Sequence, residues 1–479
     1  MDNTNRSHPI NLSTVTMKSS TMIHVRNVRL LAFNLLCACL FLSTASLKAQ
    51  QTPTTGKPEK EVYIPENTLR ECGDMKLDTG EYSFKRMKQS ENLAIIWARK
   101  YGENPMANPD TLLRFDPDYM LKEGERIYNY YIDELKFLEK GNSISDKYKC
   151  LIYIVDSQDG TAYGGGEDEK IGAFWAPPSR IRKAPFGAMA HEMGHSFQYL
   201  LGIDRAANNN PGGVGSYAFV EMTSQFLLWQ VYPTWITFEN YHLIDFMKQT
   251  HLAFLHNKNM YHSPFVMEYW ASLHGNTIIS KIWQQAKNED PVVAYKRLTN
   301  IDQKTFNDQI FDAARRFVTW DIPRIEAYSR IYANQHYTKL IKTSEPDWYA
   351  IAPEKCPQNY GYNAIKLQLP TKDSKVGLHF MGIAGTEGYR AVKVDKAGWR
   401  YGFLAVKEDG SRVYSPMYVE SDSQVNFKVP KGTAHLWLVV SGAPTEHWSI
   451  GGRNDIEEQW PYRFKLTNSA PDLAANGLQ

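Results

Sequence analysis

The chain has 479 residues, of which 43% are hydrophobic and 22% charged. It is long and apolar enough for two or three globular domains, which excludes a disordered or fibrous chain. Its 54 basic and 52 acidic residues leave a formal net charge of +2. So neutral a chain has no extended basic face, which argues against nucleic acid as a partner and favours a small molecule, a protein or a glycan.

The first 49 residues have the pattern of a secretory signal peptide. Basic residues precede the apolar run Leu30–Leu42, and Ala49 offers a cleavage point. The run has 13 residues, whereas a bilayer-spanning helix needs roughly 20. We therefore expect an exported chain, either secreted, periplasmic or at the cell surface, with no transmembrane segment after cleavage. An uncleaved anchor and lipid attachment at Cys37 or Cys39 are the alternatives.

A polar linker is predicted over residues 50–61, and a mixed α/β domain over 62–340. The cysteines that follow the linker (Cys72, Cys150 and Cys356) are too widely spaced for a disulfide scaffold or a CxxC zinc site, and allow at most one bridge.

The elements of this domain can be predicted from apolar periodicity and turn residues. We expect a helix from Asp116 to Gly141, a buried strand at KCLIYIVDS, a glycine-rich turn at TAYGGGEDEK and a second strand at IGAFWAPP. A helix follows from about Pro185 to Gly202, and another from Ser216 to Val231, with more helices up to about residue 327.

A second domain is predicted over residues 355–470, where short alternating runs are separated by Gly, Asp-Gly and Pro turns. The predicted fold class is thus α+β, with an all-β sandwich-like C-terminal domain. Aromatic residues in that domain form either its core or a sugar- or protein-binding surface; they are Trp399, Tyr401, Trp437, Trp448, Trp460 and Tyr462.

The stretch AMAHEMGHSFQYLLG carries the clearest chemical signal. Residues four apart share one face of a helix, so His191 and His195 can present two imidazoles to one ion, with Glu192 beside them. By chance, this motif arises roughly 0.02 times in a chain of this composition. The helix tolerates Gly194 at a cost of about 1 kcal/mol, which suggests that another backbone passes close to it.

A catalytic zinc needs a third protein ligand. Leu201 and Gln198 exclude a third histidine in the HExxHxxGxxH arrangement. The candidates are Asp204 and, better, Glu221, a lone charge in an apolar stretch of the next helix. A salt-bridged core glutamate is the alternative for Glu221.

HEMGH followed by Glu221 resembles the gluzincin class of zinc metallopeptidases, and the glycine before the second histidine is similar to the enhancin-like, mucin-targeting branch. The resemblance implies a zincin-like domain whose Zn²⁺ is held by His191, His195 and Glu221, with Glu192 as general base and acid. It also implies that IGAFWAPP is the edge strand along which an extended substrate pairs.

The surroundings of the motif are less well defined. Ser224 and Gln225 could hydrogen-bond the ligands, although many gluzincins have Asp where this chain has Gln225. The group that stabilises the oxyanion cannot be assigned; Tyr261, His262 and Tyr269 lie in a suitable region but are more typical of packing or surface residues. The remaining histidines of the helical region are expected on solvated helix faces: His242, His251, His256 and His274.

The sequence therefore predicts an exported zinc metallopeptidase that hydrolyses proteins or glycoproteins. One alternative is a catalytically inactive, peptidase-like protein that binds a glycan or a surface partner. The other is a structural motif without a metal. Substrate specificity and oligomeric state stay open.

Overall fold

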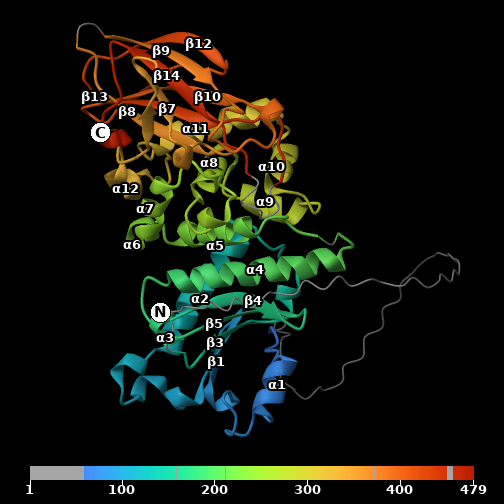
Figure 1. Cartoon of the computed structure of the whole chain (residues 1–479). Helices are drawn as coiled ribbons and strands as arrows, with labels where there is room; N and C mark the ends of the chain where they lie inside the picture. The colour runs from blue at the N-terminus through green and yellow to red at the C-terminus, as the bar shows by residue number, and fades with distance from the viewer. Residues whose placement is uncertain (1–58, 158–159, 211, 372–373, 450–456, 479) are drawn as a thin grey trace, which may run out of the picture. The chain divides into compact units, whose positions relative to one another are not determined.

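The computed structural model describes residues 59–157, 160–210, 212–371, 374–449 and 457–478. The predicted signal peptide and most of the predicted linker lie outside these residues. The described chain is α+β, as predicted, with helices and three small sheets (Figure 1). None of the described helices has both the length and the apolar character that a membrane crossing requires.

The first sheet has five strands in the order β1-β2-β3-β5-β4. They are β1 (Met87–Gln89), β2 (Leu93–Trp97), β3 (Cys150–Ile154), β4 (Tyr163–Glu167) and β5 (Ile171–Ala176). Strands β2, β3 and β5 run parallel, whereas β1 and β4 are antiparallel to their neighbours. Every residue of β2 and β3 is buried, which explains their continuous apolar sequences.

The edge of this sheet differs from the sequence prediction. The glycine-rich segment TAYGGGEDEK is not simply a turn, because its residues 163–167 form the edge strand β4. The prediction that IGAFWAPP is the edge strand is also wrong, since β5 lies between β3 and β4. A Cβ on Gly164 would lie 2.2 Å from the carbonyl oxygen of Glu192, so glycine lets the motif helix lie directly against β4.

The helices, in chain order, are α1 (Glu66–Cys72), α2 (Pro117–Asn129), α3 (Pro178–Ile181), α4 (Gly187–Ala207), α5 (Tyr217–Val231), α6 (Trp235–Phe238), α7 (Tyr241–Lys248), α8 (Phe265–His274), α9 (Ile278–Gln285), α10 (Pro291–Thr299), α11 (Gln303–Phe317) and α12 (Glu326–Ser329). Helix α5 has the predicted bounds, and the Ser216 hydroxyl caps it by accepting from the backbone N–H of Phe219.

Two helix ends differ from the predictions. Helix α2 continues only as a π-helical turn to Glu134 and does not reach Gly141. Helix α4 passes Gly202, its predicted end, and continues to Ala207. The Cβ position of Gly202 faces open space, so this glycine is tolerated inside the helix and does not stop it.

The C-terminal region consists of two antiparallel sheets, one of order β11-β10-β13-β8 and one of order β12-β9-β14-β7-β6. Their strands are β6 (Leu340–Lys342), β7 (Trp348–Ile351), β8 (Tyr362–Leu367), β9 (Lys375–Gly382), β10 (Trp399–Lys407), β11 (Arg412–Tyr414), β12 (Asp422–Lys428), β13 (Thr433–Gly442) and β14 (Tyr462–Thr467). The sheets share an apolar core in which Phe380 stacks on Tyr401 at 3.9 Å. The strands begin at Leu340, earlier than residue 355, because β7 pairs with β14.

The C-terminal aromatic residues are mostly core. Trp399, Tyr401, Trp437, Trp460 and Tyr462 are buried. Trp448 is partly exposed, and the Lys393 ammonium lies 4.6 Å from the centre of its ring. These positions favour the packing interpretation over a sugar-binding surface. The cysteines Cys72, Cys150 and Cys356 are buried free thiols, so no disulfide joins them.

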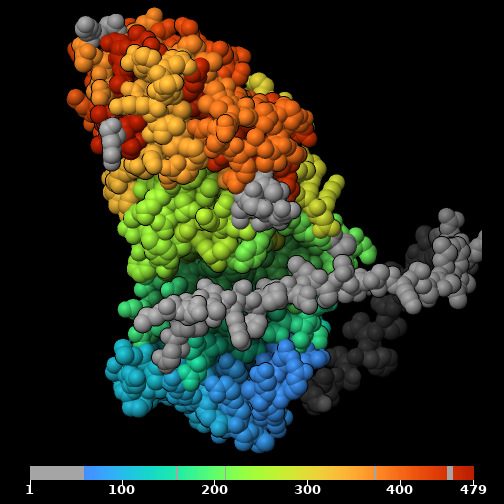
Figure 2. All heavy atoms as spheres, viewed as in Figure 1, coloured from blue at the N-terminus to red at the C-terminus, as the bar shows by residue number. Residues whose placement is uncertain are grey.

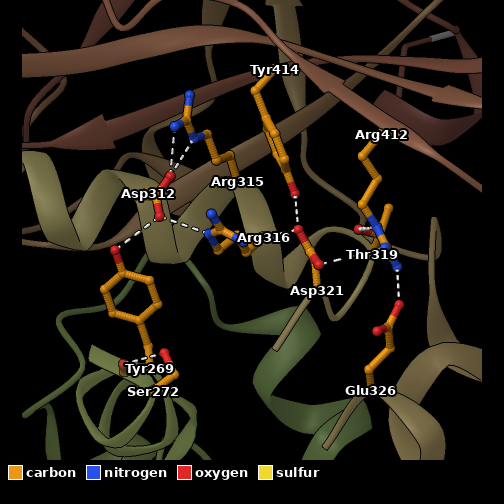
Figure 3. Close-up of polar contacts among 10 residues, drawn as sticks. All are labelled: Tyr269, Ser272, Asp312, Arg315, Arg316, Thr319, Asp321, Glu326, Arg412 and Tyr414. Atoms are coloured by element: carbon orange, nitrogen blue, oxygen red, sulfur yellow. Dashed lines mark hydrogen bonds and ion pairs between the residues drawn. The ribbon is translucent and has the colours of Figure 1, made fainter. Parts of the chain in front are cut away.

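The four-stranded sheet also packs on the helices. Leu404, Val406 and Trp437 belong to the same apolar core as α11, and the two regions meet as one continuous surface in the space-filling view (Figure 2). At the border of this core, Arg412 donates to Thr319 and Glu326, and Tyr414 to Asp321 (Figure 3). The sandwich is thus built into the fold by a shared core and a rim of ion pairs.

Candidate metal centre

Helices α4 and α5 bring the motif residues together. Helix α4 lies across the first sheet, with α5 on its other side (Figure 1). The close approach expected at Gly194 is confirmed, because a Cβ there would lie 2.9 Å from Ser224 Oγ and 3.3 Å from Ser224 Cα. This contact sets α5 beside the histidines, and Glu221 reaches them from α5.

The donor atoms of His191, His195 and Glu221 form a small triangle. The two Nε2 atoms lie 3.1 Å apart, and each lies 3.3 Å from Glu221 Oε2. Ligands at 2.0–2.1 Å from a tetrahedral zinc ion are about 3.3 Å from one another. The triangle therefore has the size that three zinc ligands require, and these residues form a group that could hold a metal ion.

The charge state of the triangle fits the same interpretation. Glu221 Oε2 is buried and has no hydrogen-bond partner among the described residues. Burial alone would raise the pKa of Glu221, but the two adjacent imidazoles hold it well below its usual range. Burial would lower the pKa of His195, but the Glu221 carboxylate raises it, so the buried charge of the triangle is balanced either by a proton on an imidazole or by a bound cation. The donor set thus fits a divalent cation that prefers imidazole and carboxylate, as zinc does.

The second ring nitrogen of His195 has its own partners. His195 Nδ1 lies 3.1 Å from Gln198 Oε1 and 3.2 Å from Ser224 Oγ. Gln198 is fixed in turn, since its Nε2 donates to the carbonyl oxygen of Val220 at 2.9 Å. These contacts orient the imidazole so that Nε2 faces the triangle. Ser224 was predicted in this role; Gln198 was missed, although it follows His195 by three residues on the same helix face.

Glu192 points into a cleft of about 260 Å³ beside the triangle. The cleft is lined by Arg180, Gly187, Ala188, His191, Glu192, Gln225, Leu228, Trp235, Glu239, Tyr241, His242 and Tyr261. Glu192 is only 8% exposed, and burial is the main cause that raises the pKa of its carboxyl. A carboxylate in this position is suited to exchange protons with a group in the cleft.

The three oxyanion candidates lie in different places. Tyr261 lines the cleft, with its ring centre 6.2 Å from that of His191, and burial is the main cause that raises its pKa. His262 Nδ1 lies 2.9 Å from His242 Nδ1, in the wall behind the cleft. Tyr269 points away and donates to Asp312 on α11 at 2.9 Å (Figure 3). Only Tyr261 has its side chain at the cleft surface.

The structure excludes the weaker candidate for the third ligand, Asp204, and two of the predicted solvated histidines. Asp204 is not near the triangle, because it lies towards the end of α4 and accepts from the backbone N–H of Ile144 at 2.8 Å. His242 and His256 are not on solvated faces: His242 lines the cleft and His256 is 5% exposed. Burial lowers the pKa of these residues to about 3 and about 4. His274 is exposed, as predicted.

Comparison with known families gives one match. Residues 54–473 match the family of unknown function DUF6055. The chain belongs to the DUF6055 family. A comparison with curated proteins finds no match. The match covers the first sheet, the helices and the sandwich, so this member of DUF6055 carries its candidate metal centre inside the family region.

Proposed function

We propose that this DUF6055 chain is a zinc-dependent metallopeptidase of gluzincin type, with a zincin-like catalytic region, that hydrolyses peptide bonds of proteins or glycoproteins. The observation that carries the proposal is the triangle of His191 Nε2, His195 Nε2 and Glu221 Oε2, with sides of 3.1–3.3 Å. The sequence pattern adds export to this proposal, because an N-terminal signal peptide directs a chain out of the cytoplasm.

His191, His195 and Glu221 would hold the ion, with Gln198 and Ser224 orienting His195. Zinc bound there supplies a Lewis acid that makes water a nucleophile near neutral pH. Glu192 takes a proton from the attacking water and passes it to the leaving amine nitrogen. Because burial raises the pKa of Glu192, its carboxyl is better matched to both transfers than an exposed glutamate.

Tyr261 is the best candidate to stabilise the oxyanion. Burial raises its pKa, so the hydroxyl stays protonated and can donate a hydrogen bond to a developing negative charge in the cleft. We expect Tyr261→Phe to lower kcat by about 100- to 1,000-fold with little change in zinc content. A variant that keeps full kcat would remove Tyr261 from this role.

The edge strand β4 is the proposed path for an extended substrate. It is the outermost strand of its sheet and packs on α4, where Gly164 touches the backbone of Glu192. A peptide that adds to the outer edge of β4 would pass beside Glu192. The predicted role of β5 in substrate pairing therefore moves to β4.

Hydrolysis by the Glu192→Gln variant tests the proposal. The wild-type chain, loaded with zinc, should cleave peptides from a mixed protein digest, and a chelator should abolish cleavage. Glu192→Gln should retain zinc and lose activity by about 100- to 10,000-fold, because the general base is removed. Full activity in this variant, or cleavage that survives complete metal removal, would refute the mechanism.

A further inference from the structure

One wall of the cleft has polar groups without partners. Arg180 of α3 lines the cleft and is exposed, and it takes part in none of the side-chain hydrogen bonds or ion pairs of the described chain. The carboxylate of Glu239, by contrast, accepts from Trp235 Nε1 at 3.1 Å and from Tyr241 Oη at 3.2 Å. Glu239 is thus engaged within the protein, whereas the Arg180 guanidinium acts on Glu192 and Tyr241 only through its charge, without a hydrogen bond or ion pair among the described residues.

The start of α4 faces the same cleft. Gly187 and Ala188, its first two residues, line the cleft. The side chain of the N-cap residue, Phe186, makes no capping hydrogen bond, and the first turn contains no acidic residue. The first backbone N–H groups of an α-helix have no partner inside the helix. Together with the dipole of this 21-residue helix, they make the cleft side of α4 favourable for an anion.

Gln225 provides independent evidence for a ligand. It lines the cleft and is 4% exposed, and its buried Oε1 has no hydrogen-bond partner among the residues that the structure describes. A buried amide oxygen without a partner is unfavourable for the folded state unless a bound group meets it. Because the oxygen and nitrogen of a glutamine amide can exchange places, Gln225 can offer an N–H donor to a bound oxygen.

We propose that this wall is a carboxylate subsite of the peptidase. Arg180, the first turn of α4 and Gln225 hold the carboxylate, while Leu228 and the buried Trp235 contact a short apolar stem. The volume of about 260 Å³ suits one such group. Since Glu192 shares the cleft, the group lies next to the bond that is cut. That the bound carboxylate belongs to a peptidase substrate rests on the proposed function. That the cleft binds a carboxylate does not.

A ligand-observed NMR titration of the full chain tests the subsite directly. The probes are N-acetylglutamic acid α-amide and N-acetylglutamine α-amide, which differ only in the side-chain carboxylate. We expect the acid to bind at least ten times more tightly than the amide, in metal-free as well as in zinc-loaded protein. Arg180→Gln should remove this difference, while the control Lys183→Gln, which removes an exposed charge outside the cleft, should retain it.

Equal affinities of the two probes, or a difference that survives in Arg180→Gln, would overturn the subsite. The metal-free arm separates this result from the peptidase proposal, because it requires neither zinc nor hydrolysis. If the subsite binds the acid and no peptide is cleaved, the subsite stands and the peptidase fails. If peptides are cleaved and neither cleavage nor binding depends on Arg180, the peptidase proposal stands and the subsite fails.

Three further probes distinguish the sources of the carboxylate. They are a peptide with an internal glutamate, the same peptide with glutamine and a free C-terminus, and N-acetylneuraminic acid. Tighter binding of the glutamate peptide identifies an acidic side chain as the source, tighter binding of the glutamine peptide a chain end, and tighter binding of N-acetylneuraminic acid an acidic sugar. In each case the preference should be lost in Arg180→Gln. Binding of all three without dependence on Arg180 would contradict the proposal.

Discussion

Two buried glutamates on neighbouring helices show how a metal ligand differs from a structural acid. Glu268 of α8 accepts from Arg324 Nε at 2.8 Å and from Gln230 Nε2 at 3.1 Å. Glu221 of α5 has no arginine or lysine beside it among the described residues; its neighbours are two imidazoles and the Tyr261 hydroxyl, and its Oε2 has no hydrogen-bond partner there. Both are less than 10% exposed. Burial therefore does not distinguish the two glutamates. What distinguishes them is that an arginine and an amide bind the carboxylate of Glu268, whereas no arginine or lysine binds that of Glu221.

The largest effect is expected at the structural acid. Glu268→Ala leaves Arg324 without its buried partner, and we expect a loss of about 3–5 kcal/mol in the free energy of unfolding. Denaturant unfolding of the metal-free protein measures this loss. Glu221→Ala is the matched control, because it removes a carboxylate that no arginine or lysine pairs with. Equal destabilisation by the two substitutions would end the distinction between these acids.

Metal removal should affect stability only while the three-ligand triangle is intact. Zinc at 1,000 times its Kd stabilises the folded state by about 4 kcal/mol. A chelator should therefore lower the Tm of the wild type and of the Lys183→Gln control, and leave the Tm of Glu221→Ala unchanged. A chelator effect that persists in Glu221→Ala would place the ion elsewhere.

Gln198 tests the orientation of His195. Gln198→Ala removes a hydrogen-bond partner of His195 Nδ1, and we expect zinc affinity to fall by about 10- to 100-fold while the stoichiometry at saturation stays the same. Competition with a chromogenic chelator gives the affinity. Ser224→Ala should have a similar effect, and unchanged affinity in both variants would show that the contacts do not support the ligand.

A buried histidine extends the comparison to a basic group. His336 is 4% exposed, and its Nδ1 has no partner in the described chain. Burial lowers the pKa of His336 to about 3, so the unfolded chain takes up a proton before the folded chain does. The contribution of neutral His336 to the free energy of unfolding is fully present above pH 6.5. It should decrease by about 1.4 kcal/mol per pH unit as the pH falls from 6.5 towards 3.

Unfolding of His336→Gln between pH 7 and 5 measures this dependence. The variant should show a flatter decline of stability than the wild type over this range. His379→Gln, which changes a partly exposed histidine on β9 of the sandwich, should follow the wild type. If the stability of His336→Gln declined with pH as steeply as that of the wild type, the imidazole of His336 would not be the cause of the decline.

Much of the fold is encoded in local patterns. The strands of the sandwich and the bounds of α5 followed from alternation, apolar periodicity and turn residues, because these signals act within a few residues. The edge strand β4 could not be predicted, since its glycines reflect the approach of α4, a contact between distant segments. The continuation of α4 past Gly202 has the same cause, because packing of the helix outweighs the weak propensity of one glycine.

The site shows a similar division. The helical spacing predicted His191, Glu192 and His195, and the apolar surroundings of Glu221 singled it out. Ser224 was predicted as a partner of the ligands, and Gln198 was within reach of the same reasoning. Arg180, Trp235, His242 and Tyr261 come from other segments of the chain, and their meeting in one cleft depends on loop paths that no local periodicity encodes.

Metal content per chain is the most direct test of the candidate centre. Elemental analysis should find about one zinc per chain in the wild type and in His262→Ala, which removes a nearby histidine outside the triangle. His195→Ala and Glu221→Ala should contain almost none. A wild type that binds no zinc, or a Glu221→Ala variant that retains it at full affinity, would contradict the three-ligand centre.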